Sequence, residues 1–530
     1  MTQKINFILL IPFLIISFLF FSNSYGESMT NLTSERPIVF SKPVELNWKN
    51  LKWQSINYSR IPVDGGAAIY LFPSPSSLKF EITLVFPQSV FSNPPSQRII
   101  LTALSETLIT GGSGNLTFEQ LQNYITEYGI NIGCHVNSQG QLTLNFSALP
   151  SEEKKVLDLI SNILFRPSFE QRSLTYWKQN IKDSYENFIQ LNALDKQMQF
   201  VDILSNTVVF GSQHYFSQYF ERINPKKANL VTLESVKDLY KKLLNKNSMN
   251  VSISGNISKN FVDQFQNMIA RIPSELPQIH TWLPGRDMLP YRNGKMKVLI
   301  VRKKDMTQSV ISLRYYYPKL GELNSIEQKE IDILEQIFSS TGGVVGNDRF
   351  SKALRADSGI SYSPHAYFNE KSLYPNTNVG TFYLNFQSPN DLFFDAVTLA
   401  TKTFDQFMKD GITQEELDNT RTSMMNRNLA TEQTVFYKSN FILSSINQNK
   451  ISSSNPLQYN LVALNEIRDL KSVNLTLHQL SENSVLPVLV LLGNPDEKQI
   501  EKLKKLPFID KVEIKDINFV LESYFKENNK

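Results

Sequence analysis

The chain carries the same short motifs twice and in the same order, and this internal repeat is the feature that most restricts its fold. Four pairs of motifs recur, with 231 to 240 residues between the two members of each pair. The pairs are Phe86-Pro87 and Tyr317-Pro318, Thr110-Gly111-Gly112 and Thr341-Gly342-Gly343, Leu144-Asn145-Phe146 and Leu384-Asn385-Phe386, and Gly255-Asn256 and Gly493-Asn494. A single match of this kind is uninformative, but four in register predict one structural unit that is present twice.

Both copies of the repeat contain patterns typical of strands and of amphipathic helices. Alternation of apolar and polar residues predicts strands at residues 68–72, 80–86, 130–148 and 250–254 of the first copy, and at 297–302 and 308–316 of the second. Apolar residues that recur every four positions predict helices between the strands. The sequence therefore predicts an α+β fold of two homologous halves, each a mostly antiparallel sheet covered by helices.

The N-terminus has the features of an export signal. Lys4 precedes a 15-residue apolar run at 7–21, which is short for a membrane span of about 20 residues. Ser24-Tyr25-Gly26 follows, with small residues where a signal peptidase would cleave. We therefore expect an exported, periplasmic protein that has lost residues 1–26. The alternative is that the segment stays uncleaved and anchors the chain in the membrane.

Composition gives the remaining boundaries. Residues 27–60 carry scattered Ser, Asn and Pro, whereas four prolines fall between positions 272 and 294, which is typical of a linker. The expected segments are a signal peptide at 1–26, an extended lead-in at 27–60, a first α+β domain at 61–271, a proline-rich linker at 272–294, a second α+β domain at 295–517 and a charged tail at 518–530.

Charge and motif content argue against several other classes of protein. The 54 basic and 50 acidic side chains leave a net charge of +4, which is too weak to indicate nucleic-acid binding. The single cysteine, Cys134, excludes an internal disulfide. The sequence contains no G-x-S-x-G elbow, phosphate-binding loop or dinucleotide fingerprint.

The most distinctive stretch of the second copy runs from Ile331 to Tyr362. Its pattern predicts a helix, a glycine loop from Thr341, a second helix closed by Arg355, and a tight turn at Gly359 before a strand that Tyr362 opens. A short turn of this kind can bring Arg355 and Tyr362 to the same end of the two elements. Taken alone, the two residues would be a solvated helix arginine and a half-buried strand tyrosine.

The repeat together with this stretch resembles the insulinase/pitrilysin-type zinc metallopeptidases, over approximately residues 66–515. The motif L-R-x(6)-Y, from Leu354-Arg355 to Tyr362, matches the Arg–Tyr pair of that family, and the stretch from Asp410 to Leu417 is similar to a helix start usual there. The resemblance implies two halves that form a clam-like shell around a peptide. It also implies that Arg355 and Tyr362 hydrogen-bond the scissile carbonyl as it gains negative charge.

The metal site of the catalytic family members is degenerate in this sequence. Those members carry H-x-x-E-H on the helix before the first glycine loop, where two His bind zinc and the Glu is the general base. The corresponding positions here are Ala103, Glu106 and Thr107, so only the Glu remains. Asp183 or Glu186 could match the third ligand, a Glu from a later helix, but neither replaces the two His.

The histidines do not supply an obvious substitute site. The chain has five, His135, His214, His280, His365 and His478. No two of them lie four residues apart, as two zinc ligands on one helical face would. We therefore expect this chain to bind no metal or other cofactor, with zinc held instead by a partner.

Two functions are compatible with this combination. The first is a non-catalytic subunit of an exported two-chain zinc metallopeptidase, inactive alone, that donates Arg355 and Tyr362 to the zinc site of an H-x-x-E-H-bearing insulinase-like partner for peptide hydrolysis. The alternative is a structural or peptide-binding insulinase-like protein with no role in catalysis, since binding by edge-strand addition needs no metal. The Arg–Tyr pair discriminates between them, because a purely structural protein has no need of it.

Overall fold

The fold is described by a computed structural model of the chain. It describes residues 58–89, 95–136, 141–210, 223–247, 249–274, 295–318, 325–339, 348–369, 379–431, 434–447, 464, 466, 467, 469–482 and 485–526. The predicted signal peptide, nearly all of the lead-in, most of the linker, the glycine loop from Thr341, and the histidines His214 and His280 lie outside the described residues.

The first half is built on a six-stranded sheet, which we call sheet 1, with the order β1-β2-β6-β3-β5-β4. The strands are β1 (Ser59–Val63), β2 (Ala67–Pro73), β3 (Phe80–Ser89), β4 (Asn131–Val136), β5 (Gln141–Ala148) and β6 (Asn250–Gly255). Neighbouring strands are antiparallel except β2 and β6, which are parallel. Strand β4 is therefore an edge strand.

The second half repeats this arrangement in sheet 2, with the order β12-β7-β11-β8-β10-β9. The strands are β7 (Met296–Arg302), β8 (Gln308–Pro318), β9 (His365–Asn369), β10 (Val379–Pro389), β11 (Val485–Gly493) and β12 (Ile509–Asp516). Five strands occupy the same places in both sheets, while β12, parallel to β7, takes the place of β1. The predicted α+β fold of two homologous halves is confirmed.

The helices also follow the repeat. Those of the first half are α2 (Pro95–Thr110), α3 (Phe118–Glu127), α4 (Glu153–Phe165), α5 (Gln171–Gln190), α6 (Leu194–Phe210), α8 (Pro225–Leu230), α9 (Leu233–Leu243) and α10 (Lys259–Ala270). Those of the second are α11 (Ser325–Phe338), α12 (Arg349–Ser351), the π-helix η6 (Lys352–Asp357), α13 (Phe393–Asp410), α14 (Gln414–Thr431), α15 (Val435–Asn447), α17 (Leu470–Glu482), α18 (Glu497–Lys504) and α19 (Ile517–Lys526). No helix of the described residues is long and apolar enough to cross a bilayer.

The residues assigned from sequence to a charged tail are in part a packed helix. Helix α19 begins at Ile517, and its Val520 is buried against sheet 2. The sequence boundary falls too early because the polar residues of α19 alternate with apolar ones, a pattern that the charge of the segment obscures.

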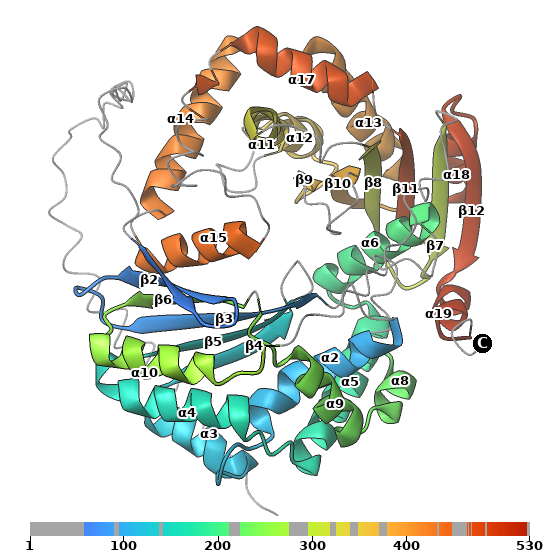
Figure 1. Cartoon of the computed structure of the whole chain (residues 1–530). Coiled ribbons are helices and arrows are strands. Elements are labelled where there is room, and N and C mark those ends of the chain that lie inside the picture. The colour runs from blue at the N-terminus through green and yellow to red at the C-terminus, as the bar shows by residue number, and fades with distance from the viewer. Residues whose placement is uncertain are drawn as a thin grey trace, which may run out of the picture. The chain divides into compact units, whose positions relative to one another are not determined.

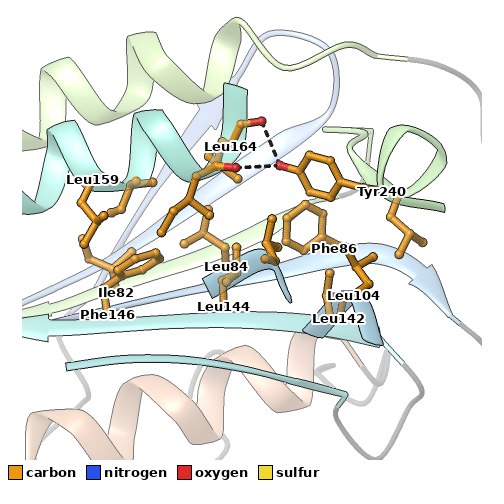
Figure 2. Close-up of a cluster of buried hydrophobic side chains, with 14 of the residues drawn as sticks. Ile82, Leu84, Phe86, Leu104, Leu142, Leu144, Phe146, Leu159, Leu164 and Tyr240 are labelled. Atoms are coloured by element: carbon orange, nitrogen blue, oxygen red, sulfur yellow. Dashed lines mark hydrogen bonds between the residues drawn. The ribbon is translucent and has the colours of Figure 1, made fainter. Parts of the chain in front are cut away.

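One face of sheet 1 carries the core of the first half. The alternation of β3 and β5 directs Ile82, Leu84 and Phe86, and Leu142, Leu144 and Phe146, to this face, where they meet Leu104, Leu159 and Leu164 from the helices (Figure 2). The Tyr240 hydroxyl donates to the carbonyl oxygens of Ile163 and Leu164, at 3.2 and 2.8 Å. The carbonyl groups in the last turn of a helix have no hydrogen-bond donor within that helix. Tyr240 therefore supplies a donor to two carbonyl groups at the end of α4.

The opposite face of each sheet is covered in part by a helix from the other half. Helix α15 packs on β6 and β2 of sheet 1, and α6 packs on β8 and β11 of sheet 2 (Figure 1). Ile442 and Leu443 of α15 contact the cluster around Phe72, while Val201 and Leu204 of α6 join the apolar face of sheet 2. Each half therefore supplies a helix that covers part of the sheet of the other half.

A buried arginine reinforces the contact between α6 and sheet 2. Arg314 of β8 is fully buried, and its guanidinium forms an ion pair with Asp202 of α6. The same group donates to Asn206 Oδ1 at 2.8 Å and lies 4.2 Å from the ring centroid of Tyr383. A buried charge is tolerated only with such partners.

Removing the carboxylate of Asp202 should destabilise the protein strongly. In Asp202→Ala the guanidinium of Arg314 stays buried without its counter-ion, a situation that typically costs about 3–5 kcal/mol. Urea denaturation followed by circular dichroism measures the loss. The control is Asp195→Ala, an exposed carboxylate at the start of the same helix, and an equal, small effect of both substitutions would contradict the prediction.

Candidate functional site

The two histidine positions of the degenerate metal motif are occupied by buried side chains on α2. Ala103 is fully buried, and Thr107 is 1% exposed. The Thr107 hydroxyl donates to the Ala103 carbonyl oxygen at 2.7 Å, which satisfies it within the helix. Ala103 has no ligand atom, and a threonine hydroxyl is a poor zinc ligand.

Glu106, the remaining residue of the motif, lies half-buried beside the edge strand β4. Helix α2 packs on β4, and burial raises the pKa of the Glu106 carboxyl above its ordinary value. Burial, and then the nearby Glu106, also raise the pKa of the Cys134 thiol. The carboxyl therefore sits in a poorly solvated position, which disfavours its charged form.

The positions considered for a third ligand face solvent. Asp183 and Glu186 are exposed on α5, where Asp183 accepts a hydrogen bond from Gln179 at 2.7 Å and Glu186 lies 3.9 Å from the Lys182 amine. His135, His365 and His478 are on separate elements. Among the described residues, no three His, Cys, Asp or Glu side chains are grouped so as to hold a metal ion. The described residues at the motif positions do not fit zinc.

Arg355 and Tyr362 are brought together, as their spacing suggested. The Arg355 guanidinium lies 4.6 Å from the centroid of the Tyr362 ring. The Tyr362 side chain is 76% exposed, and Arg355 forms no ion pair within the part of the chain that the structure describes. Tyr362 is therefore accessible to solvent, and Arg355 lies half-buried beside it.

The local backbone differs from the sequence expectation. Arg355 lies inside a π-helix that continues to Asp357, and Tyr362 lies in a bend rather than at the start of a strand. The strand begins at His365 because Pro364 has no N–H to donate to a ladder. Single π-turns of this kind are frequent at functional sites.

The turn between the two residues is held at several points. Leu354 is fully buried, and its carbonyl accepts from the Ser361 N–H at 2.9 Å. Gly359 has a φ of +66°, which a residue with a side chain rarely adopts. The Ser361 hydroxyl accepts from the Gln387 N–H of β10 at 3.3 Å, which ties the turn to sheet 2.

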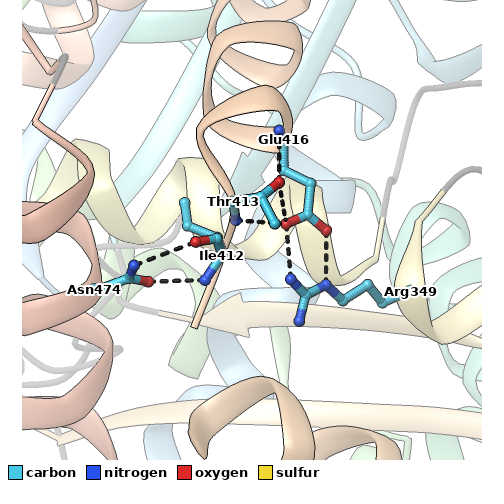
Figure 3. Close-up of polar contacts among 5 residues, drawn as sticks. All are labelled: Arg349, Ile412, Thr413, Glu416 and Asn474. Atoms are coloured by element: carbon cyan, nitrogen blue, oxygen red, sulfur yellow. Dashed lines mark hydrogen bonds and ion pairs between the residues drawn. The ribbon is translucent and has the colours of Figure 1, made fainter. Parts of the chain in front are cut away.

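An ion pair fixes the start of the short helix that leads to Arg355 (Figure 3). Arg349 donates to both carboxylate oxygens of Glu416, at 2.8 and 2.7 Å. Glu416 also accepts from the Thr413 N–H at 2.8 Å, the capping arrangement at the start of α14. Partial burial alone would raise the pKa of the Glu416 carboxyl, but these hydrogen bonds outweigh it and hold the pKa below its ordinary value. Within the stretch from Asp410 to Leu417, Glu416 therefore caps the start of α14 and binds Arg349 at the start of α12.

Residues 230–424 match the family described as the peptidase M16 inactive domain, a range that includes Arg355 and Tyr362. This part of the chain is therefore similar to the M16, or insulinase/pitrilysin-type, peptidases. The matched range does not include the degenerate metal motif, where Ala103 and Thr107 stand at the two histidine positions of H-x-x-E-H. A search of curated proteins returns no match.

Solved structures share the fold at low sequence identity. The M16 inactive domain from Pseudomonas fluorescens is 15% identical, with a TM-score of 0.67 over 83% of this chain and 99% of that one. A protease from Helicobacter pylori is 11% identical, with a TM-score of 0.66 over 82% and 99%. The periplasmic protease PqqL from Escherichia coli is 14% identical, with a TM-score of 0.66 over 91% of this chain but 50% of its own length. This chain thus spans about half of PqqL.

Two features of the site were not found from sequence. The bond between Arg349 and Glu416 joins residues 67 positions apart, although Thr413-x-x-Glu416 is a visible capping signature. The second feature is a polar pocket on sheet 1, whose residues come from three strands and from α15. Alternation along one strand shows only that a face is polar, and not what covers it.

The raised pKa of Glu106 predicts how stability depends on pH. A carboxyl with a raised pKa in the folded state favours folding at low pH, and this contribution is lost as pH rises through that pKa. Glu106→Gln should therefore raise the free energy of unfolding at pH 7, and the gain should disappear below about pH 4.3, the ordinary glutamate pKa. Urea titrations at several pH values measure it, with Glu127→Gln at the exposed end of α3 as the control. A gain of the same size at all pH values would refute the assignment.

Proposed function

We propose that this chain is the non-catalytic subunit of a two-chain zinc peptidase and donates Arg355 and Tyr362 to the site of a partner. The observation that carries the proposal is an asymmetry between the halves. Arg355 and Tyr362 are juxtaposed, with Tyr362 exposed and Arg355 half-buried, whereas the positions of the two metal ligands are filled by a buried alanine and an internally bonded threonine. The M16 inactive-domain match supports this assignment.

The chemistry of the pair suits an anion that forms during a reaction. A carbonyl attacked by water becomes an oxyanion, which preorganised N–H and O–H donors stabilise more than the ground state. The Arg355 guanidinium supplies charge and directional donors, and the Tyr362 hydroxyl supplies another. In the proposed complex, zinc held by the partner would supply Lewis acidity and an activated water, and this chain would position the donors Arg355 and Tyr362.

The partner would be an M16 chain that carries an intact H-x-x-E-H motif, and the substrate would be a peptide. Export is part of the proposal, since the N-terminal segment has the pattern of a signal and the structural neighbour PqqL is a periplasmic protease.

A second function, peptide binding without catalysis, is favoured by the free edge of sheet 1. Strand β4 is the last strand of its sheet, and no described strand pairs with its outer side. An extended peptide could add to such an edge through main-chain hydrogen bonds. The two functions are compatible, because a subunit that holds substrate would also need a binding edge.

Purified protein should contain no stoichiometric zinc and cleave no peptide, because Ala103 offers no ligand atom. Inductively coupled plasma mass spectrometry and a quenched-peptide assay test this. About one tightly bound zinc per chain would overturn it. The double substitution Ala103→His with Thr107→His asks whether the two ligands suffice, and we expect weak zinc binding because the third position is open.

Arg355→Ala and Tyr362→Phe should each lower turnover by the complex with an H-x-x-E-H partner. Loss of one donor to an oxyanion typically reduces kcat by about 10²–10³. The effect should appear in kcat more than in KM, because the contact strengthens in the transition state. Folding should be unaffected, since an exposed cation–π contact contributes only about 0.5–1 kcal/mol.

The control for this experiment is Lys352→Ala, an exposed cation on the same π-helix. Zinc content and subunit stoichiometry are measured for each complex. Full activity of both variants in a complex of normal composition would exclude the shared site and leave the binding function.

A further inference from the structure

A polar pocket lies on the face of sheet 1 that is opposite the hydrophobic core. Its volume is about 490 Å³, which is within the usual range for a ligand site. The floor is formed by residues of β3, β5 and β4, and the wall by α15 from the second half. Asn250 donates to Asn447 at 2.7 Å, a bond that attaches α15 to the sheet beside the pocket.

The register of the strands determines which residues lie side by side on the floor of the pocket. His135 of β4 is paired with Thr143 of β5, and Gly133 with Asn145. The Asn145 amide and the His135 ring lie 3.3 Å apart, between Nδ2 and Nδ1. The Thr143 side chain is only 4% exposed, and its hydroxyl has no hydrogen-bond partner among the described residues. A buried hydroxyl without a partner at a pocket surface is suited to a ligand atom.

The pocket opens toward the edge strand at Gly133. A Cβ built at this glycine would have no atom within 4 Å, so the middle of β4 leaves a gap. An extended chain added to β4 would direct alternate side chains to the face of the sheet that carries the pocket. A side chain beside Gly133 would therefore face the row of Thr143 and Asn145.

The electrostatics of the lining restrict which side chain fits. The lining is rich in amides and hydroxyls, with Asn440 and Ser444 on the wall. Its one carboxylate, Glu81, is paired with Lys79 at 2.6 Å. A charged guest would lose hydration without gaining a counter-ion, and an apolar guest would leave the polar lining unsatisfied.

We infer that this pocket selects an uncharged, hydrogen-bonding side chain, an amide or a hydroxyl, of an extended peptide paired with β4. The inference rests on the proposed function in that it takes the ligand to be a peptide, and it adds a specificity that the Arg–Tyr pair does not provide.

The test uses the full chain and fluorescein-labelled nonapeptide pools that differ only in one fixed central residue, Gln, Glu, Lys or Leu. Fluorescence anisotropy measures binding. We expect the Gln pool to bind about tenfold more tightly than the others, the size of effect that one or two neutral hydrogen bonds provide. The preference should be lost in Thr143→Val, which removes the hydroxyl at constant shape, and in Gly133→Leu, which fills the gap.

Gly133 has no positive φ, so the substitution to Leu should not strain the backbone. Thr126→Val on the exposed face of α3 is the matched control and should keep the preference, as should Arg355→Ala. Circular dichroism verifies that each variant is folded.

The outcomes separate this inference from the proposed function. Binding of all four pools with equal affinity, or a Gln preference that survives Thr143→Val and Gly133→Leu, would overturn the pocket and leave the donation of Arg355 and Tyr362 intact. Absence of binding to every pool would overturn the pocket and peptide binding by the isolated chain. A loss of turnover in Arg355→Ala complexes with an unchanged pool preference would support both.

Discussion

The contact between Arg314 and Asp202 is the point on which the relation between the halves depends. A guanidinium with almost no exposed surface must keep its counter-ion, and that counter-ion belongs to a helix of the other half. Tyr383 and Asn206 complete its surroundings. The ion pair therefore holds α6 on sheet 2, and strand β10 of the same sheet is tied to the turn between Arg355 and Tyr362.

The two sheets use their covered faces differently. On sheet 2, α6 lies over Val310, Val490 and Leu492, and the contact is apolar except around Arg314. On sheet 1, the apolar contacts of α15 involve β2 and Val85 of β3, and beyond them the sheet carries Thr143, Asn145 and their neighbours. The same arrangement therefore gives a mainly apolar contact on sheet 2 and a polar pocket on sheet 1.

Much of this architecture could be predicted from sequence because repeat and alternation are local signals. Three of the four paired motifs fall at equivalent strands in the two halves, and the fourth lies partly outside the described residues. Arg355 and Tyr362 meet as a seven-residue spacing suggests. The bend at Tyr362 differs from the expected strand because Pro364 has no N–H for a ladder, so the strand begins only at His365. The placement of α6 and α15 was not accessible, since an amphipathic helix does not specify which sheet it covers. Asn250 and Asn447 are 197 positions apart, so no local sequence pattern predicts the polar pocket beside them.

The reciprocal placement of α6 and α15 has a consequence for the origin of the chain. Two copies of one unit that exchange an identical element form a domain-swapped dimer. Joining the copies through a segment such as residues 272–294 would give a single polypeptide with the exchange preserved. After such a duplication the two copies can diverge independently. The first can lose metal-ligating residues while the second retains Arg355 and Tyr362. Each copy still keeps the helix that covers part of the sheet of the other.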